Sequence, residues 1–288
     1  MKHINSIKEI SDYQYFIFDI WGVIHDGESV YPESIDAIKY LRSLNKNICF
    51  VSNAPRRNFV VANLLNKFGI DKTLYDFIIS SGEVAFINLK DNQENGFLEY
   101  GKNYFYIGPR KDIDLLQGLD YNIVKDAKDA DFILTTGFDH DKSVDNEKLS
   151  QLKECLKYDL KMICVNPDLI VVKKDGRKMN CAGLIGKQYH ELGGKVEYCG
   201  KPHKLVYKMT CNLFKTKEKR NIIAVGDSLD TDIIGANNNN IDSLLITGGL
   251  LSDVFQIKYW QNCNPRDIEQ LCNEQNIFPN FVISNLKI

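Results

Sequence analysis

The chain has 288 residues, of which 44% are hydrophobic and 26% are charged, which suits two domains or one large α/β unit with a buried core. Its formal net charge of −2, with both signs interspersed, argues against a nucleic-acid or anionic-membrane partner. No apolar stretch approaches about 18 residues and the first residues lack the apolar segment of a signal peptide, so we expect no membrane span and a cytoplasmic protein.

From the N-terminus, apolar runs alternate with segments whose apolar residues recur at helical spacing. We expect a strand at residues 15–20, a helix within 31–47, a second strand within 47–55 and a second helix within 56–70. A third strand-to-helix step follows at residues 77–89. Because helices separate the strands, the sequence predicts a parallel sheet with helices on both faces.

A polar segment at residues 90–103 suggests a domain boundary, and three further strand-like runs beyond it indicate a smaller α/β unit. The first pattern resumes with a helix expected at residues 201–214. We therefore predict an α/β fold in which a Rossmann-like, doubly wound parallel sheet forms the core domain. The core would comprise residues 1–83 and 198–288, and residues 84–197 would form an inserted, smaller α/β cap domain that sets substrate specificity.

Eight cysteines are spread along the chain, and no C-x-x-C pair occurs. Several lie within apolar runs, so we expect reduced and mostly buried thiols. The spacing of Cys199 and His203 could suit a metal ion, but no second pair of ligands lies nearby in the sequence. We therefore do not expect a zinc site.

Polar residues follow several of the expected strands. In open parallel sheets, ligands bind beyond the carboxyl ends of the strands. This rule brings together four stretches that are far apart in the sequence: Asp19, Ser52 with Asn53, Lys201, and Asp227. Taken singly, each has a structural explanation, such as a turn, a helix start or a solvated charge. Asp232, in the first turn of an expected helix, could likewise complement the helix dipole.

Taken together, these residues supply what phosphoryl transfer requires. Asp19 offers a carboxylate oxygen that can form an aspartyl phosphate. Asp19 and Asp227 are hard oxygen donors that suit Mg²⁺, which would reduce the repulsion between an anionic nucleophile and an anionic substrate. Ser52, the amide of Asn53 and the ammonium of Lys201 could bind the remaining phosphate oxygens.

Four short motifs carry a family resemblance: "FDIWGV", "FVSNAP", "GKPH" and "GDSLDTD", in this order along the chain. Together they resemble the haloacid dehalogenase superfamily, in its class IIA, nitrophenylphosphatase-like branch. The stretches "SSGEVA" and "VNPD…NCAGLI" resemble the segments where the chain of that branch enters and leaves its α/β cap. The resemblance implies a Mg²⁺-dependent phosphatase that hydrolyses a small phosphorylated metabolite through an aspartyl phosphate. The resemblance is also compatible with a homodimer.

The resemblance also implies residue roles. Asp19 would be the nucleophile and a metal ligand, and the backbone carbonyl of Trp21 would be a second ligand. Asp227 would bind Mg²⁺ with Asp232 in support, and Lys201 would pair with the phosphate and with Asp19. The residues expected to contact phosphate or substrate are Ser52, Asn53 and Lys201 in the core, and Asn166 and Asp168 at the cap–core junction.

Trp21 departs from the family pattern D-x-D, in which the second Asp is the general acid and base. Indole can do neither, and the loss of such a group costs about 10²–10⁴ in rate. The enzyme could therefore be restricted to good leaving groups such as aryl or acyl phosphates. Alternatively, His25 or Asp26 could replace the acid, although Asp-Gly favours a plain turn. Trp21 could stack on a ring of the substrate or pack into the core.

Two non-hydrolytic alternatives remain. The first is a catalytically weak protein that binds a phosphorylated ligand, or interacts with partners, on the same fold. Ligand binding that depends on Mg²⁺ without turnover would favour it. The second is a response-regulator-like receiver, which is phosphorylated on an Asp without being an effective hydrolase. A receiver is much shorter and has no inserted cap, so the length of this chain disfavours it.

Overall fold

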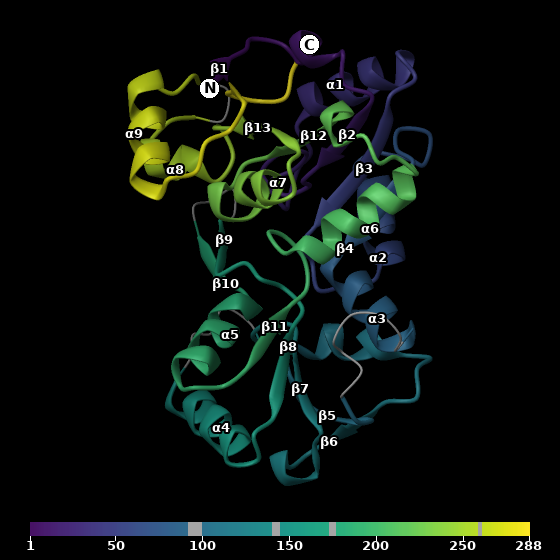
Figure 1. Ribbon diagram of the computed structural model, residues 1–288, viewed down its shortest axis with the longest axis vertical. Helices are drawn as coiled ribbons and strands as arrows, with labels where there is room; N and C mark the ends of the chain where they lie inside the picture. Colours follow the sequence, from purple (N-terminus) through teal and green to yellow (C-terminus); the bar gives the residue numbers. More distant parts are fainter. Residues whose placement is uncertain (92–99, 140–144, 173–176, 259–260) are drawn as a thin grey trace.

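The computed structural model describes residues 1–91, 100–139, 145–172, 177–258 and 261–288. These residues form two parallel β-sheets flanked by helices, and an antiparallel hairpin lies between them (Figure 1). The larger sheet lies at the end of the molecule that holds both chain termini, and the middle of the chain forms the smaller sheet at the other end. Most of the polar segment at 90–103 lies outside the described residues.

The larger sheet has seven parallel strands in the order β1-β14-β13-β12-β2-β3-β4. Their bounds are β1 (Lys2–His3), β2 (Tyr15–Phe18), β3 (Asn47–Ser52), β4 (Phe77–Ser80), β12 (Ile222–Gly226), β13 (Asp242–Ile246) and β14 (Phe281–Ile283). In register, Phe18 of β2 lies between Val225 of β12 and Phe50 of β3. The carboxyl ends of these three strands therefore meet at one edge of the sheet.

Helices cover both faces of this sheet because side chains alternate between the faces along each strand. Phe16 and Phe18 of β2 share a core with helices α1 (Pro32–Ser43) and α2 (Asn58–Lys67). Ile17, which points the other way, shares a core with α3 (Ser81–Asp91), α6 (Lys204–Phe214) and α7 (Ile234–Asn238). Two more helices, α8 (Leu251–Phe255) and α9 (Pro265–Gln275), pack beside β13 and β14. The predicted doubly wound parallel sheet is confirmed.

The smaller sheet has five parallel strands in the order β11-β8-β7-β5-β6. Their bounds are β5 (Asn103–Ile107), β6 (Asn122–Val124), β7 (Phe132–Thr135), β8 (Lys161–Cys164) and β11 (Val196–Tyr198). Helices α4 (Asn146–Lys157) and α5 (Ala182–Glu191) cover one face, and the other face shares its core with α3. Since α3 crosses the predicted boundary at residue 84, the division into 1–83, 84–197 and 198–288 stays a proposal.

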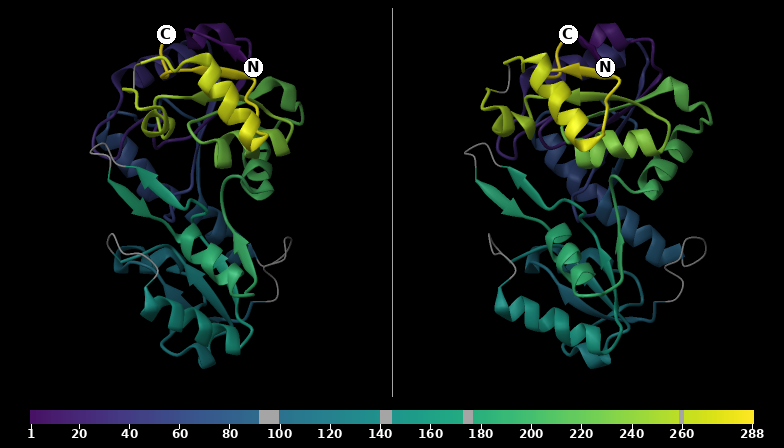
Figure 2. Two further views of the ribbon diagram at one scale, coloured as in Figure 1. Left: turned by 90° about the vertical axis from the view of Figure 1, so that its left-hand side faces the viewer. Right: turned by 60° about the vertical axis from the view of Figure 1, so that its left-hand side comes forward.

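The hairpin comprises β9 (Ile170–Val172) and β10 (Lys178–Asn180) and leads from the smaller sheet toward the larger one (Figure 2). The sequence does not predict this hairpin, because each of its strands has only three residues. No helix among the described residues is both long and apolar enough to cross a membrane. All eight cysteines are free thiols and seven are buried, as expected.

The start of the helix α6 differs from the prediction. We expected it to begin at Lys201, whereas it begins at Lys204, after His203. Proline disfavours the helical conformation in the residue before it, and Pro202 follows Lys201 directly. Lys201 therefore lies in the turn that precedes α6, where its side chain can reach the ends of the strands.

Candidate active site

Three neighbouring strands place polar residues at one edge of the larger sheet. Asp19 follows β2 directly, Asp227 follows β12 directly, and Ser52 is the last residue of β3. Because β2 lies between the other two strands and all three are parallel, these residues come together at the edge where ligands bind in such sheets.

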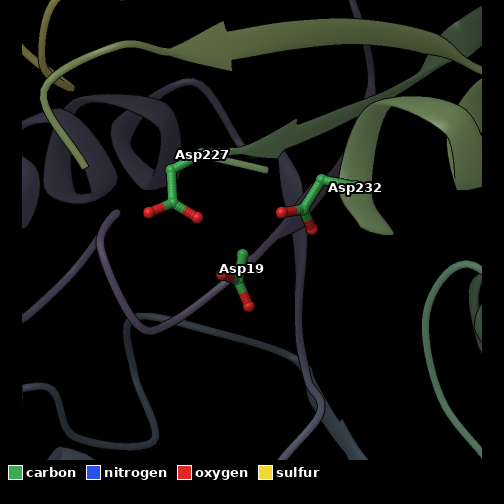
Figure 3. Close-up of side chains that lie close together, drawn as sticks. All are labelled: Asp19, Asp227 and Asp232. Carbon is green, nitrogen blue, oxygen red and sulfur yellow. The ribbon is translucent and has the colours of Figure 1, made fainter. Parts of the chain in front are cut away.

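The side chains of Asp19, Asp227 and Asp232 lie close together (Figure 3). One carboxylate oxygen from each residue lies within 4.8 Å of the other two. Asp232 comes from a π-helical turn at Leu229–Ile233, just before α7. Asp227 and Asp232 are buried and Asp19 is nearly so. The side chains predicted to bind a metal ion are thus gathered at one point.

Lys201 is a buried cation that faces this cluster. Its Nζ donates hydrogen bonds to Oδ1 of Asp19 over 2.5 Å and to Oδ1 of Asp232 over 2.7 Å. Burial alone would lower the pKa of the ammonium, but the two carboxylates outweigh it and raise the pKa above its ordinary value. Lys201 therefore stays charged and fixes the orientation of the Asp19 carboxylate.

One ammonium does not neutralise three buried carboxylates. Burial, followed by the charges of Asp19 and Asp232, raises the pKa of Asp227 well above its ordinary value. Burial also raises the pKa of Asp19, against the opposing effect of Lys201. A cation between such carboxylates favours their charged forms, and carboxylate oxygens are the ligands that Mg²⁺ prefers. The residues present therefore fit a divalent metal ion.

Two glycines let the backbone approach Asp227 closely. A Cβ atom at Gly22, whose φ is +78°, would lie 1.9 Å from Oδ2 of Asp227, and one at Gly249 would lie 2.3 Å from it. The same oxygen accepts a hydrogen bond of 2.7 Å from the backbone N–H of Leu250. Gly249 and Leu250 lie outside the four motifs, so the sequence offered no signal for their contact with Asp227.

Trp21 is half-buried and lines the cleft. A Cβ atom at Gly27 would lie 2.2 Å from Cη2 of Trp21, so the indole packs directly against that glycine. The indole also meets the ring of His25 edge to face, with ring centroids 5.5 Å apart. The side chain is thus held by its own loop, while the proposed metal contact of its backbone carbonyl stays a prediction.

The two residues considered as replacements for the missing acid are engaged in that same loop. Burial lowers the pKa of His25 to about 4, and its Nδ1 accepts a hydrogen bond from the N–H of Gly27. Oδ1 of Asp26 accepts hydrogen bonds from the N–H groups of Glu28 and Ser29 at 3.0 and 2.7 Å. These contacts stabilise a turn, so they favour the plain-turn interpretation.

The residues predicted to contact phosphate or substrate also line the cleft: Ser52, Asn53, Asn166, Asp168 and Lys201. The side chain of Asn53 is turned to Asp168 and to the backbone of Lys201. Oδ1 of Asn166 accepts a hydrogen bond of 2.9 Å from the N–H of Asp168. The structure brings these residues together, but the side chains of Asn53 and Asn166 contact protein groups. Their roles toward a substrate stay predictions.

A cleft of about 1920 Å³ extends from the carboxylate cluster to the smaller sheet. Its far wall includes residues 109–112 and 136–139, which follow β5 and β7, and the hairpin β9–β10 lines it as well. Nε of Arg56 contacts Oδ1 of Asp112 across the cleft at 3.1 Å. This ion pair was not predicted, because nothing in the sequence around Arg56 or around Asp112 indicates that the two residues meet.

Comparison with known proteins adds the family. The sequence profile described as haloacid dehalogenase-like hydrolase matches residues 16–122, and one described as HAD-hydrolase-like matches residues 198–267. Phosphoglycolate phosphatase 2 of Arabidopsis thaliana is 26% identical over 259 residues, or 83% of this chain and 84% of the relative. Sugar-phosphatase AraL of Bacillus subtilis is 25% identical over 242 residues, or 81% of this chain and 82% of the relative.

Solved structures agree with these matches. A haloacid dehalogenase-like hydrolase from Brucella suis has a TM-score of 0.82 and 25% identity, over 98% of this chain and 99% of that chain. A 4-nitrophenylphosphatase from Thermotoga maritima has the same fold, with a TM-score of 0.71 and 24% identity over 96% of this chain and 95% of that chain. The chain belongs to the haloacid dehalogenase-like hydrolases and is an enzyme of their phosphatase type.

Proposed function

We propose that the protein is a Mg²⁺-dependent phosphatase that hydrolyses a small phosphorylated metabolite through an aspartyl phosphate on Asp19. The observation that carries this proposal is the Asp19 carboxylate, which is held by Lys201, is flanked by Asp227 and Asp232, and lines a large cleft together with Asp227. A small phosphorylated metabolite is supported by relatives named as phosphatases of phosphoglycolate and of sugars.

In the first step, an Asp19 carboxylate oxygen attacks phosphorus while the bond from phosphorus to the ester oxygen breaks. Lys201 already holds Oδ1 of Asp19, so the nucleophile needs little reorientation. The Lys201 ammonium also lies where it can offset negative charge on the phosphoryl oxygens. In the second step, water attacks the aspartyl phosphate, which releases inorganic phosphate and restores the Asp19 carboxylate.

Asp19, Asp227, Asp232 and the backbone carbonyl of Trp21 would hold the metal ion. Bound Mg²⁺ would offset the charge of the substrate phosphate and of the nucleophile, which otherwise repel each other. The hydroxyl of Ser52 and the backbone amide of Asn53 lie at the end of β3 and would bind the remaining phosphate oxygens. No proton transfer is assigned to Trp21, because indole is neither an acid nor a base at neutral pH.

The missing acid bears on the choice of substrate. An aryl or acyl leaving group departs as a stable anion, whereas an alkoxide needs a proton as it leaves. His25 and Asp26 are bound within their own loop, which supports the proposal that the enzyme prefers good leaving groups. The same observation favours a second candidate, in which the protein binds a phosphorylated ligand and releases little phosphate.

The test is phosphate release from p-nitrophenyl phosphate and from an alkyl monophosphate, each with and without Mg²⁺. Asp19→Asn serves as the blank. We expect turnover of the aryl ester that depends on Mg²⁺ and on Asp19, with little turnover of the alkyl ester. Full phosphate release by Asp19→Asn would contradict the proposed nucleophile. Binding of the alkyl ester in the presence of Mg²⁺, without turnover of either compound, would favour the second candidate.

A further inference from the structure

The side chain of Asn53 joins three parts of the molecule. Its Oδ1 accepts a hydrogen bond of 2.8 Å from the backbone N–H of Lys201, and its Nδ2 donates one of 3.0 Å to the backbone oxygen of Lys201. The same Nδ2 donates a hydrogen bond of 2.7 Å to Oδ1 of Asp168. A single amide therefore connects the end of β3, the turn that carries Lys201, and the segment that follows β8.

This arrangement is closely packed. Asn53 is only 4% exposed, and a Cβ atom at Gly200, whose φ is +108°, would lie 2.5 Å from its Oδ1 and 2.0 Å from Oγ of Ser81. Asn53 can satisfy both backbone groups of Lys201 because an amide carries a donor and an acceptor side by side. Neither carboxylate nor aliphatic side chains of this size can do so.

Asp168 is also held by hydrogen bonds. Its backbone N–H donates to Oδ1 of Asn166 over 2.9 Å, and its carboxylate receives the hydrogen bond from Asn53. Burial raises the pKa of Asp168, while the hydrogen bond from Asn53 lowers it. These contacts of Asn53 and Asp168 thus run to each other, to the backbone and, for Asn53, to Oγ of Ser81 at 3.3 Å, although we had expected both residues to touch the substrate.

We propose that Asn53 is a positioning residue that holds the backbone of Lys201 in place and ties it, through Asp168, to the segment that leaves the smaller sheet. This inference rests on the proposed phosphatase function. The Lys201 ammonium donates to both Asp19 and Asp232, so its place depends on where the backbone of Lys201 is held. A shift of the Lys201 turn would therefore misplace the cation beside the nucleophile, and errors of about 1 Å in such groups can cost about 10²-fold in rate.

Three variants test these hydrogen bonds one at a time, because Asn and Asp side chains have nearly the same size. They are Asn53→Asp, Asp168→Asn and the double variant. Asn53→Asp removes the donor to Lys201 and sets two carboxylates against each other. Asp168→Asn keeps an acceptor for Asn53. In the double variant the new amide at 168 can donate to the new carboxylate at 53, while the backbone oxygen of Lys201 stays without its donor.

We expect kcat on p-nitrophenyl phosphate to fall by about 10- to 100-fold in Asn53→Asp and to fall less in Asp168→Asn, which keeps an acceptor for Asn53. The double variant should fall between them, because it regains only the contact with position 168. KM should change less than kcat. Asn239→Asp is the matched control, since Asn239 is also 4% exposed and its Nδ2 donates to a backbone oxygen, that of Gly235, over 2.8 Å. It should lower the Tm and leave kcat unchanged.

Several results would overturn the inference. If Asn53→Asp lowers only the Tm, as the control does, then Asn53 is merely structural. If Asn53→Asp or Asp168→Asn raises KM at constant kcat, that residue contacts the substrate instead. If the double variant is no more active than Asn53→Asp, positions 53 and 168 are not coupled. Absence of Mg²⁺-dependent phosphate release by the unchanged protein would overturn the proposed function first and this inference with it, so the two failures are distinguishable.

Discussion

Trp21 lies two residues after Asp19, at the position that the resemblance to the D-x-D motif assigns to a general acid. Its indole packs against Gly27 and the ring of His25 rather than deep in the core. Trp21 could stack on a ring of the substrate or pack into the core. In the structure its side chain packs within its own loop, where it lines the cleft. A carboxylate at this position would face the same cleft.

Trp21→Asp should therefore add a proton donor for the leaving group. We expect the rate on an alkyl monophosphate to rise by up to about 10²–10⁴-fold, which is the usual contribution of a general acid. The rate on p-nitrophenyl phosphate should rise less, because that leaving group needs no proton and only the attack of water on the aspartyl phosphate can gain from the new carboxylate acting as a base. The measurement is kcat on both esters at saturating Mg²⁺.

Trp21→Phe is the control, because it keeps an aromatic ring and supplies no acid. It should leave the ratio of the two rates unchanged. An equal gain on the alkyl ester in both variants would mean that the smaller side chain, rather than the carboxylate, is responsible.

The sequence was sufficient to predict that Asp19, Asp227 and Lys201 come together and that Lys201 pairs with Asp19, but not the hydrogen bonds of the Asn53 side chain. Asp19 and Asp227 were predictable because each follows an apolar strand, and parallel strands end at one edge. Asn53 was predicted as a phosphate contact from its place after β3. Its side chain bonds to Lys201, which lies 148 residues away in the sequence. Such a contact depends on how two loops meet, and local patterns do not encode it.

The loop after β3 also reaches the smaller sheet at a second point. Arg56 of this loop contacts Asp112, at the start of the segment that follows β5. The Asp112 side chain is 3% exposed and that of Arg56 is 39% exposed. Burial raises the pKa of Asp112, against the effect of Arg56. The pair therefore joins the two sides of the cleft through a buried carboxylate.

Breaking this pair should weaken substrate binding rather than the chemical step. Without it, we expect Arg56→Gln to populate arrangements in which the smaller sheet lies farther from the catalytic residues. If the competent fraction falls to about one tenth, the apparent affinity falls about tenfold, so KM should rise by that amount while kcat holds. Steady-state kinetics on p-nitrophenyl phosphate measure both constants.

Two further variants control this experiment. Arg56→Gln combined with Asp112→Asn should have a higher Tm than Arg56→Gln alone, because no unpaired carboxylate is left buried. Asp120→Asn removes the exposed ion pair with Lys102 in the same unit and should leave KM unchanged. A drop in kcat at constant KM in Arg56→Gln would place Arg56 in the chemical step instead.

At the level of the elements, the helices and the strands of four or more residues that carry a clear apolar pattern were predicted correctly, whereas strands of three residues were not. Helices α1 and α2 and strands β2 and β3 fall within their predicted ranges, because their apolar residues repeat over two or more turns or fill a buried strand. The three-residue strands of the β9–β10 hairpin carry too little pattern to be recognised. The start of α6 was placed too early because the effect of Pro202 on Lys201 was overlooked.

The two sheets together define the cleft, since residues at the carboxyl ends of strands from both sheets line it. The alternation of strands and helices predicted the parallel sheet of the core and a smaller α/β unit beside it, because parallel strands need crossover connections. How the sheets face each other was not predictable, because it depends on contacts such as Arg56–Asp112 and Asn53–Asp168. The carboxylate cluster of Asp19, Asp227 and Asp232 also affects the free energy of unfolding of the whole protein.

In the absence of metal, the folded protein must bury Asp19, Asp227 and Asp232 against the single charge of Lys201. Mg²⁺ at about 100 times its Kd should therefore raise the free energy of unfolding by about 2.7 kcal/mol, measured as a rise in Tm. Asp227→Asn removes one of the repelling charges and can still accept the hydrogen bond from Leu250. We expect it to raise the Tm of the metal-free protein and to abolish most of the gain from Mg²⁺. If Asp227→Asn instead lowers the metal-free Tm and keeps the full Mg²⁺ effect, the cluster is a structural network and the metal binds elsewhere.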